Sequence, residues 1–487
     1  MSMPIPSNDL HTPLQSLIEG LPIQRVGRGN PLIQGISSDS RQVVPGDLFI
    51  AKPGRLVDGE HYIAAALHAG AVAILSRRPH PLFPNIPHLI TPNIFEVEAQ
   101  ILSRYYRDPS DHLRLVGITG TNGKSTTAHL LAHFLGVEKG QCGLMGTLGH
   151  RIGTGRRLAP LTTPNAITLH RYLHEMVRLG CAHAVMEVSS HALTQKRMNG
   201  TRCSGAIFTN LSHDHLDYHG SMLAYGKAKR RLFQEHLAPG GYLLINGDDP
   251  TFSSWDWGNS LSVIHFGQDA PADIWGKVKG DEIEVMLHGK RMSLPFPLMG
   301  EHNASNLLGA IGAGYEEGLT LEEMGESLVH FRGVPGRLES VRDGKGPSVF
   351  IDFAHTPDAL QAVLRACRNY ASLILVMGCG GERDRKKRPE MGAIAHQHAH
   401  HVIFTSDNPR REEPQAIIDE ILKGVPSLEN HRVIVERPRA IQEAIWQAKE
   451  EDVVLIVGKG HEGHQIIGDQ EIPCDDREIA KRALSIW

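Results

Sequence analysis

The sequence predicts an α/β protein of three domains, in which a central parallel sheet is followed by a C-terminal, Rossmann-like sheet. Three observations support this prediction: the length of 487 residues, a glycine-rich turn between an apolar strand and a helix near residue 120, and a second series of alternating strands and helices after residue 335. A chain of this length is expected to form about three domains, each with its own core. We place the domains at residues 1–110, 111–334 and 335–487.

Charge and cysteine content exclude several classes of protein. The chain has 50 basic and 54 acidic residues, so it lacks a general positive field for nucleic acid or membrane surfaces. The N-terminal MSMPIPSNDLHTPL has no basic segment followed by an apolar core, and no apolar run approaches the roughly 20 residues of a membrane helix. The six scattered cysteines form no C-x-x-C pair, which argues against a structural zinc site and a disulfide framework. We expect a cytoplasmic monomer with no nucleic-acid partner and no membrane span.

The N-terminal domain is expected to be a small α/β unit. Short apolar runs at 72–75 and 88–91 alternate there with turns rich in proline and glycine. Residues 37–51, SSDSRQVVPGDLFIA, combine a polar cluster, a turn and a strand, which is the composition of a loop that holds a ligand.

Residues 113–127, LRLVGITGTNGKSTT, predict a phosphate-binding loop between a strand and a helix. The spacing fits G-x-x-x-x-G-K-[ST], and the glycines permit backbone conformations in which successive N–H groups converge on phosphate oxygens. The lysine would contact the β- and γ-phosphates and the serine hydroxyl Mg²⁺, so the central sheet is expected to be P-loop ATPase-like, with ATP and Mg²⁺ as ligands. The alternative is a glycine-rich turn with a solvated lysine. The expected nucleotide contacts are Gly117, Gly120, Thr121, Asn122, Gly123, Lys124, Ser125 and Thr126.

Further strands are predicted at 182–188, 205–209 and 242–245. The first contains Glu187 near its carboxyl end, where a carboxylate beside a phosphate loop can hold Mg²⁺ directly or through water. Alternatively, Glu187 is a charge at a helix N-terminus, and Ser189 and Ser190 are caps.

The segment TNLSHDHLDYHG, residues 209–220, packs three histidines and two aspartates into a dozen residues. A zinc site is conceivable, but no cysteine contributes and an ATP site already requires magnesium. His215 is the best candidate for a metal ligand.

The C-terminal domain shows the most regular pattern. Strands are predicted at 349–352, 373–377, 402–405, 432–435 and 453–457, with helices between them. This alternation is typical of a doubly wound sheet, whose ligands bind beyond the carboxyl ends of the strands.

Together, the motifs resemble the Mur ligase family, the ATP-dependent amide-forming enzymes of peptidoglycan precursor synthesis. The resemblance spans nearly the whole chain and rests on GTNGKST (120–126), EVSSHAL (187–193), NLSHDHLDYHG (210–220), GEHNASN (300–306), PGRLE (335–339) and DFAHTPDAL (352–360). Within the family, SSDSR, TTP and DNPR resemble members that add meso-2,6-diaminopimelate to UDP-N-acetylmuramoyl-L-alanyl-D-glutamate. The resemblance therefore implies these two compounds as substrates.

The implied reaction converts a carboxylate into an acyl phosphate, which the amine then attacks. Both steps crowd negative charge, which Mg²⁺, Lys124 and an arginine would offset. By resemblance, Arg337 reaches the γ-phosphate and Asp352 holds the ribose. His302, Asn303 and Asn306 would surround the nucleotide. Taken alone, Arg337 could equally form a salt bridge in a linker.

Lys229 matches the lysine that carbon dioxide carbamylates in this family, which would give an anion able to ligate a second Mg²⁺. Carbamylation requires a neutral amine, which burial and nearby positive charge favour. Lys227 is a competitor, and both lysines could simply belong to a basic helix at 227–231.

The resemblance also implies two substrate pockets. Diaminopimelate ends in a second amino-acid centre, so its pocket needs a cation for the carboxylate and acceptors for the ammonium. The residues implied there are Arg383, Asp407, Asn408, Pro409, Arg410, Gly458 and Glu462. DNPRREEP is also compatible with a turn and helix start whose glutamates favour the helix N-terminus. For the nucleotide-sugar substrate the implied residues are Ser38, Thr162, Thr163, Ser189, Gln195 and Arg197.

Two other functions remain compatible with the phosphate loop. A folate-polyglutamate-type ligase shares the loop and the chemistry, but the SSDSR and DNPR segments argue against it. A non-catalytic ATP-binding regulator would have no need of Lys124, Glu187, His215, Lys229 and Arg337 together. ADP release that depends on both substrates would distinguish the ligase from the regulator.

Overall fold

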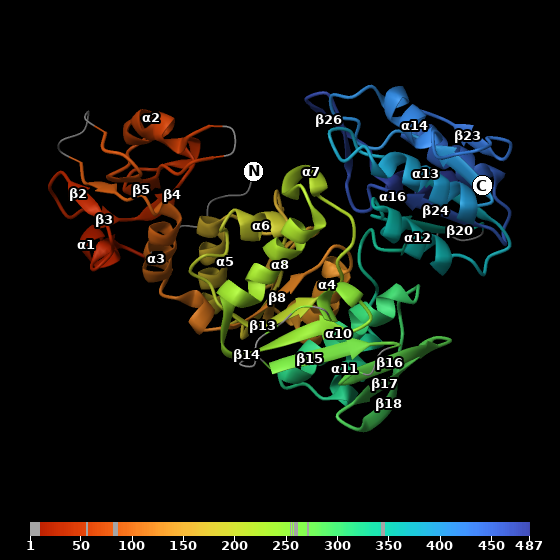
Figure 1. Ribbon diagram of the computed structural model, residues 1–487, viewed down its shortest axis with the longest axis horizontal. Helices are drawn as coiled ribbons and strands as arrows, with labels where there is room; N and C mark the ends of the chain where they lie inside the picture. The colour runs from red at the N-terminus through yellow and green to blue at the C-terminus, as the bar shows by residue number, and fades with distance from the viewer. Residues whose placement is uncertain are drawn as a thin grey trace. The chain divides into compact units, whose positions relative to one another are not determined.

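The computed structural model describes residues 10–54, 57–80, 86–253, 255, 257, 262–269, 272–341 and 346–487 (Figure 1). The first nine residues, where we expect no targeting signal, lie outside the described part. Internal contacts divide the chain into two compact units. Unit 1 holds Met1–Gly117, Leu135–Ala206 and Arg230–Tyr242, and unit 2 holds Ile118–Phe134, Ile207–Lys229 and Leu243–Trp487. The units differ from the three predicted domains, whose boundaries stay a prediction. In the part that is described, no helix combines the length and apolarity of a membrane crossing.

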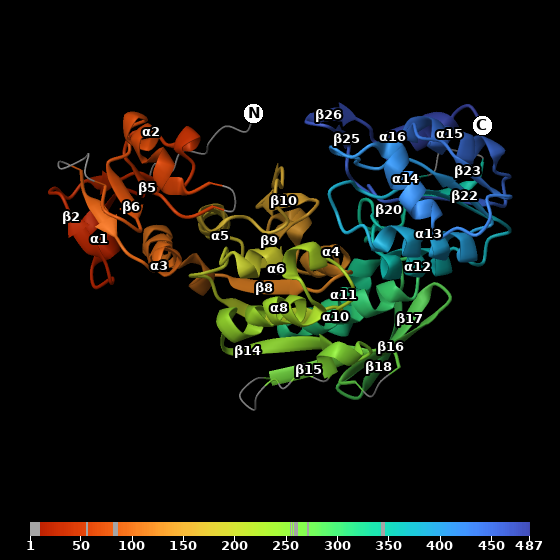
Figure 2. The same cartoon turned by 45° about the horizontal axis from the view of Figure 1, so that its top comes forward.

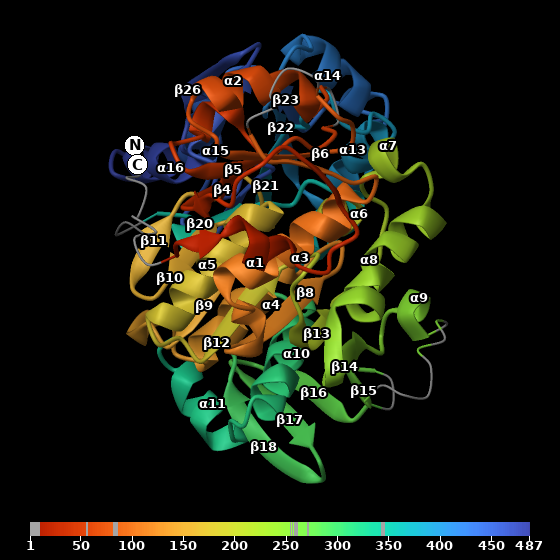
Figure 3. The ribbon, with the colours of Figure 1, turned by 90° about the vertical axis from the view of Figure 1, so that its left-hand side faces the viewer.

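Unit 1 contains the N-terminal α/β layer, whose sheet has the order β2-β7-β6-β5-β4. Leu14 and Leu17 of α1 and Val97 of α3 belong to one apolar cluster, whereas Ile63 of α2 belongs to another that includes Phe49 and Ile74. Figure 3 shows α2 on one side of these strands and α1 and α3 on the other. The elements are β1 Thr12–Pro13, α1 Leu14–Ile18, β2 Gln24–Val26, β3 Leu32–Ile33, β4 Gly35–Ser37, β5 Asp47–Ile50, α2 Ile63–His68, β6 Ala73–Ser76, β7 His88–Ile90 and α3 Ile94–Tyr106.

The largest sheet has 11 strands in the order β11-β10-β9-β12-β8-β13-β14-β15-β16-β17-β18, and the division into units passes through β8, β13 and β14. Its elements in unit 1, or beginning there, are β8 Arg114–Thr119, β9 Cys142–Gly146, β10 Gly149–Ile152, β11 Gly155–Arg157, α5 Ala166–Arg178, β12 His183–Glu187, α6 Ser190–Thr194, β13 Cys203–Phe208 and β14 Leu237–Asn246. The rest are α4 Lys124–Phe134, α7 Leu216–His219, α8 Met222–His236, α9 Pro250–Ser253, β15 Ser262–Gly267, β16 Ile274–Lys279, β17 Glu282–Leu287, β18 Lys290–Pro295, α10 His302–Glu316 and α11 Leu321–Leu328.

The C-terminal sheet, in unit 2, has the order β19-β20-β24-β21-β22-β23 and is parallel except at β19. Two apolar clusters cover its faces, one with α12, α13 and α14 and the other with α15 and α16 (Figure 2). The elements are β19 Glu339–Val341, β20 Ser348–Asp352, α12 Pro357–Ala366, β21 Leu373–Met377, α13 Lys387–His398, β22 His401–Phe404, α14 Pro414–Leu422, β23 His431–Val433, α15 Arg437–Gln447, β24 Val453–Val457, β25 His464–Ile467, β26 Gln470–Pro473 and α16 Asp476–Leu484.

The predicted α/β class with parallel sheets is confirmed, with antiparallel additions that the sequence analysis did not identify. β16, β17 and β18 form an antiparallel meander, and β10 and β11 form a hairpin on β9. The six cysteines are buried and unbridged. Burial raises the pKa of Cys203, Cys367 and Cys379 to about 12, so these thiols are protonated at neutral pH, as expected of structural cysteines.

Candidate active site

The phosphate loop Gly120–Gly123 connects β8 to α4 as the sequence predicts. Its two outer glycines have positive φ angles, +156° at Gly120 and +83° at Gly123. A Cβ at Gly120 would lie 1.9 Å from Oγ1 of Thr209, and one at Gly123 would lie 2.2 Å from Oδ1 of Asn306. Glycine is therefore required at both positions by conformation and by close packing.

Gly117 differs from the expectation. It lies within β8, its φ angle is outside the positive region, and its Cα packs against Leu232 and Cys203. Its small size leaves room for those side chains, with Cδ1 of Leu232 only 3.1 Å from where a Cβ would stand. The prediction for its backbone is therefore wrong: Gly117 supplies no unusual conformation, because β8 continues to Thr119.

Asn210 holds the loop in shape from the end of β13. Its Oδ1 accepts the N–H of Asn122 at 2.8 Å, its Nδ2 donates to the carbonyl of Asn122 at 3.1 Å, and its own carbonyl accepts the N–H of Thr121. These two loop amides are therefore committed to Asn210. Amides available to an anion must come from later in the loop and the first turn of α4.

Two lysines meet at one carbonyl of the loop. Nζ of Lys124 donates to the carbonyls of Gly120 at 2.9 Å and Thr121 at 2.7 Å, and Nζ of Lys229 donates to the carbonyl of Gly120 at 2.6 Å. Lys229 is 1% exposed and its Nζ lies 4.4 Å from the centre of the Tyr225 ring. The competing Lys227 is exposed, which favours Lys229 as the functional residue.

Lys229 has the electrostatic surroundings of a neutral amine. Burial first, and the charge of Lys124 second, lower the pKa of Lys229 well below its ordinary value, while Asp214 opposes the shift. An unprotonated amine is the form that reacts with carbon dioxide. Its surroundings are therefore consistent with carbamylation.

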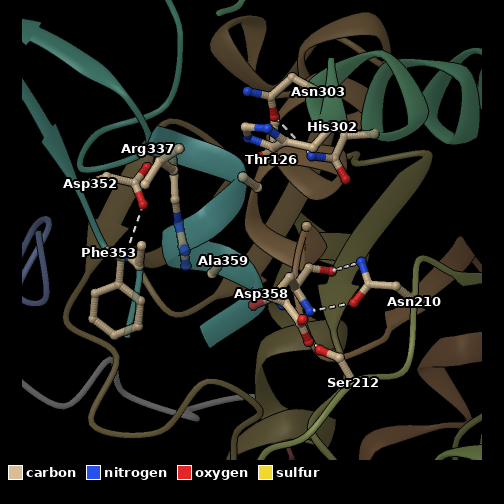
Figure 4. Close-up of a pocket in the computed structure, with 16 residues that line it drawn as sticks. Thr126, Asn210, Ser212, His302, Asn303, Arg337, Asp352, Phe353, Asp358 and Ala359 are labelled. Carbon is tan, nitrogen blue, oxygen red and sulfur yellow. Dashed lines mark hydrogen bonds between the residues drawn. The ribbon is translucent and has the colours of Figure 1, made fainter. Parts of the chain in front are cut away.

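A cavity of about 250 Å³ in unit 2 opens beside the phosphate loop (Figure 4). Arg337 lines it, with its guanidinium 4.8 Å from the centre of the Phe353 ring and Nη2 donating to Oγ of Ser125 at 3.2 Å. No carboxylate of the described residues forms an ion pair with Arg337 within 4 Å, which disfavours the linker salt bridge. Other predicted nucleotide contacts at the cavity are Asn122, Gly123, Thr126, His302, Asn303, Asn306 and Asp352.

Polar groups around the cavity are fixed by hydrogen bonds to the backbone or to each other. Asp352 accepts the N–H groups of Leu338 and Ala354, both at 2.7 Å, and burial raises the pKa of its carboxyl against the opposing charge of Arg337. Nδ2 of Asn306 donates to Oδ1 of Asn303 at 2.8 Å. Burial lowers the pKa of His302 to about 4, so its ring is uncharged at neutral pH and can hydrogen-bond to a nucleotide without adding charge.

His215, the predicted metal ligand, precedes α7 with a left-handed φ of 53°. Its Nε2 lies 3.3 Å from Oδ2 of Asp214. Burial would raise the pKa of Asp214, but the charges of His355, His215 and Lys387 outweigh it and lower that pKa to about 2. An anionic carboxylate therefore stands beside His215 at neutral pH.

The other histidines of this segment have structural contacts. Nε2 of His213 lies 2.9 Å from Oδ2 of Asp384, and the His219 ring packs against Tyr218 and Tyr225. Over the described ranges, no three His, Cys, Asp or Glu side chains converge as metal ligands. The conceivable zinc site is therefore not found among these residues.

Glu187 is buried at the end of β12 in unit 1. Its Oε1 accepts the N–H of Thr147 at 3.0 Å, and its Oε2 accepts the Thr147 hydroxyl at 3.1 Å. Ser189 is indeed the N-cap of α6, since its Oγ accepts the N–H of Ala192. The capping alternative thus holds for Ser189, whereas the Glu187 carboxylate faces Thr147 rather than the helix.

Most residues predicted for the nucleotide sugar gather near Glu187. Oγ1 of Thr162 lies 3.0 Å from Oγ1 of Thr147, and Thr163 is fully buried with its hydroxyl donating to the Glu187 carbonyl. Arg197 donates to the Thr163 carbonyl and to Oε1 of Gln195. Ser38 stands apart from this group in the chain, directly after β4, and is partly exposed.

The residues predicted for the amino acid form one cluster at the carboxyl ends of β22 and β24. Nδ2 of Asn408 donates to Oε2 of Glu462 at 2.7 Å, and a Cβ at Gly458 would lie 2.2 Å from Oδ2 of Asp407. Burial, then the charge of Arg383, lower the pKa of Arg410. Burial, then Asp407, raise the pKa of Glu462. The cluster thus offers both cations and carboxylates, as a zwitterionic ligand requires.

The DNPR segment, residues 407–410, is a loop hydrogen-bonded to β25, and the helix start that DNPRREEP also predicts follows it, with Glu413 as the N-cap of α14. The N–H of Arg410 donates to the Ile466 carbonyl at 2.9 Å, and that of Ile466 donates to Oδ1 of Asn408 at 2.9 Å, so the segment is hydrogen-bonded to β25. The expectation for the glutamates is wrong for Glu412, which accepts two hydrogen bonds from Arg388 instead of stabilising the N-terminus of α14.

Sequence reasoning assigned no role to Asn210 or Phe353. Asn210 lies in the motif NLSHDHLDYHG, but its loop partner is 88 positions away, so no local spacing reveals the contact. Phe353 directly follows Asp352 in DFAHTPDAL, and its ring supports the Arg337 guanidinium.

Three family descriptions match the chain in order. "Mur ligase family, catalytic domain" matches residues 32–106, "Mur ligase middle domain" residues 118–314 and "Mur ligase, glutamate ligase domain" residues 336–460. A UDP-N-acetylmuramoyl-L-alanyl-D-glutamate–2,6-diaminopimelate ligase from Gloeobacter violaceus is 42% identical over 467 residues, 93% of this chain and 94% of that protein.

Solved structures agree with this match. A UDP-N-acetylmuramoyl-L-alanyl-D-glutamate–2,6-diaminopimelate ligase superposes with a TM-score of 0.67 at 31% identity, over 98% of this chain and 99% of that chain. A MurF ligase from Thermotoga maritima, solved in complex with ADP, has a TM-score of 0.63 at 17% identity, over 93% and 96%, and so shares the fold. The chain belongs to the Mur ligase family, whose members are ATP-dependent, amide-forming enzymes.

Proposed function

We propose that this chain joins meso-2,6-diaminopimelate to UDP-N-acetylmuramoyl-L-alanyl-D-glutamate at the cost of ATP, forming the tripeptide precursor of peptidoglycan. Family membership and the similarity to diaminopimelate ligases support the class of reaction. The main support for diaminopimelate as the amino acid is one cluster, in which Arg383 and Arg410 lie with Asp407 and Glu462. Two cations and two carboxylates suit the second zwitterionic centre of diaminopimelate.

The first step transfers the γ-phosphoryl group of ATP to a carboxylate of the acceptor, which gives an acyl phosphate and ADP. The amides at the N-terminus of α4 and the Lys124 ammonium bind the phosphates. Arg337, which already contacts Ser125 in the first turn of α4, offsets the charge on the transferred group. Asp352 takes the ribose, and His302, Asn303 and Asn306 enclose the nucleotide.

The second step is attack of the diaminopimelate amine on the acyl phosphate. The amine must lose its proton, the carbon–nitrogen bond forms, and phosphate leaves with the electrons of the carbon–oxygen bond. The amino-acid cluster orients the distal end of the substrate, which brings the reacting amine into place. Ser38, Thr162, Thr163, Ser189, Gln195 and Arg197 would hold the nucleotide-sugar acceptor.

Magnesium fits the oxygen donors that the sequence supplies, because carboxylate and hydroxyl oxygens are its preferred ligands. Ser125, Glu187 and carbamylated Lys229 would supply such oxygens and His215 a ring nitrogen, and we propose these residues as ligands of the magnesium ions, which would offset the charge of the reacting anions. Burial and the charge of Lys124 lower the pKa of Lys229, which supports the carbamate.

We further propose domain boundaries near residues 110 and 334. The family matches end at residue 106 and begin again at 118 around the first boundary, and end at 314 and begin again at 336 around the second, which supports both positions. ATP and UDP-linked sugars are cytoplasmic metabolites, and all proposed site residues lie on one chain, so we propose that the enzyme acts in the cytoplasm as a monomer.

The test is phosphate release by the purified chain with ATP, Mg²⁺, UDP-N-acetylmuramoyl-L-alanyl-D-glutamate and one amino acid at a time. We expect release only when the acceptor and meso-diaminopimelate are both present, with a product heavier than the acceptor by one diaminopimelate less water. Equal release with L-lysine would overturn the assigned specificity. ATP binding with no release from any amino acid would favour a regulator.

A further inference from the structure

A fully buried ion pair lies behind the amino-acid cluster. Arg437 is the first residue of α15 and Asp476 the first of α16, and both side chains are 0% exposed. Nε of Arg437 donates to Oδ1 of Asp476 at 2.8 Å, and Nη2 donates to Oδ2 at 2.6 Å. This paired geometry fixes the plane of the guanidinium group.

The same guanidinium reaches the end of β24 and the segment just after β22. Its Nη2 donates to the carbonyl of Val457, the last residue of β24, at 2.9 Å, and its Nη1 donates to the carbonyl of Ser406 at 3.4 Å. Val457 directly precedes Gly458, and Ser406 directly precedes Asp407. One buried side chain therefore cross-links the two backbone segments that carry the amino-acid cluster.

Stability alone gives a weak reason for this arrangement. A buried ion pair seldom stabilises a fold more than well-packed apolar residues of the same size, because both charges lose their hydration. Burial opposes the charge of Arg437, yet Asp476 and also Asp407 raise its pKa above the ordinary value. The charge thus persists and acts on a carboxylate of the cluster.

From this geometry we infer that Arg437, oriented by Asp476, is a positioning residue for the amino-acid substrate. It sets the spacing between Asp407 and the segment from Gly458 to Glu462, and hence the acceptors that receive the distal ammonium. The inference rests on the proposed function, since it assigns Arg437 to the pocket of that reaction.

The test compares two variants. Arg437→Lys keeps the positive charge but loses the paired guanidinium hydrogen bonds, and Asp476→Asn keeps the size of the side chain but loses its negative charge. The matched control is Glu443→Gln on the same helix α15, which breaks an exposed ion pair of 2.7 Å with Arg432 far from these strand ends in the chain. Phosphate release gives kcat and the KM values for diaminopimelate and ATP, and thermal melting monitors folding.

We expect Arg437→Lys to raise the KM for diaminopimelate about tenfold or more, because small displacements of binding groups are costly. The KM for ATP should stay within about twofold of wild type, and Glu443→Gln should match wild type in every constant. Asp476→Asn should shift the KM for diaminopimelate in the same direction as Arg437→Lys.

A lower melting temperature with an unchanged KM for diaminopimelate would show a purely structural pair and overturn the inference. If Arg437→Lys fails to fold, Asp476→Glu replaces it in the comparison of KM values, because it keeps both charges and only lengthens the acidic side chain. A wild-type chain without diaminopimelate-dependent release overturns the proposed function, and the inference with it. Normal wild-type release with unaltered variants overturns the inference alone.

Discussion

Lys124 and Lys229 donate to the same carbonyl, that of Gly120, yet their surroundings fit them for different tasks. Lys124 is partly exposed at the start of α4 and can turn towards an arriving phosphate. Lys229 is buried, where the lack of solvent first and the charge of Lys124 second disfavour an ammonium. A charged lysine for the nucleotide thus lowers the pKa of the lysine proposed for carbamylation.

Replacement of Lys124 by alanine should abolish ligase activity. The β- and γ-phosphates lose their fixed cation at the moment charge develops, and removal of one such group costs about a hundred- to a thousandfold in kcat. Phosphate release with both substrates measures the loss. Lys227→Ala removes an exposed lysine of α8 and should behave as wild type. Near-normal turnover by Lys124→Ala would show that the phosphate-loop assignment is wrong.

Lys229→Ala should be nearly inactive, and acetate at high concentration should restore part of its activity by replacing the carbamate. The reason is the buried position and depressed pKa of the amine, which favour reaction with carbon dioxide. Turnover is measured across a series of acetate concentrations, with Lys124→Ala as a variant that acetate should not rescue. Full activity of Lys229→Ala without any carboxylate would exclude the carbamate.

At the scale of elements, the DNPR segment shows how a loop gains a defined shape from a distant hairpin. Arg410 has a left-handed φ of 52°, and its carbonyl accepts the N–H of Gly468 at 2.7 Å. Nη1 of Arg410 donates to the carbonyl of Gly381 at 2.8 Å. The guanidinium is therefore held in a partly buried place, where a substrate carboxylate would be its natural anion.

Replacement of Arg410 by alanine should depress the use of diaminopimelate far more than it weakens ATP binding. A hydrogen bond to a charged group contributes about 1.5–3 kcal/mol, so losing the contact should cost on the order of ten- to a hundredfold or more in kcat/KM. Lysine use need not rise, because removing one attraction builds no pocket for another side chain. The measurement is kcat/KM for both amino acids in wild type and variant, and an unchanged preference would reduce DNPR to a structural segment.

The sequence predicts buried elements better than the contacts that shape the site. The strands 373–377 and 453–457 are found where expected, because fully buried parallel strands are continuous apolar runs. The β16–β18 meander was missed, since its strands are half exposed and alternate with short turns. Asn210 and Arg437 were missed for another reason. Both act through backbone carbonyls or amides far away in sequence, and such contacts leave no local pattern.

At the scale of the whole molecule, buried neutral histidines couple folding to pH. His150, in β10, is 2% exposed, and burial lowers its pKa to about 4 from the ordinary 6.5, while Glu187 opposes the shift. Between these two values the unfolded chain binds a proton that the folded chain does not. Stability therefore falls as the pH falls through 6.5 towards 4.

His150→Gln should lessen this acid sensitivity. Through His150, wild type should lose about 2 kcal/mol of unfolding free energy between pH 7 and pH 5, because only the unfolded state binds the additional proton. Urea unfolding at both pH values measures the difference. The variant should be less stable than wild type at pH 7 but lose less on acidification, and an equal loss in both proteins would mean that His150 is protonated in the native state.

The hydrogen bonds between Asn210 and the phosphate loop affect how tightly nucleotide binds. Ordering the backbone of one residue costs about 1–2 kcal/mol of free energy through lost conformational entropy, and a disordered loop would incur that cost for each residue when nucleotide binds. Thr121 and Asn122 are held by hydrogen bonds to Asn210, which lies just after β13. Binding energy from the phosphates is then free to favour the reacting geometry instead of shaping the loop.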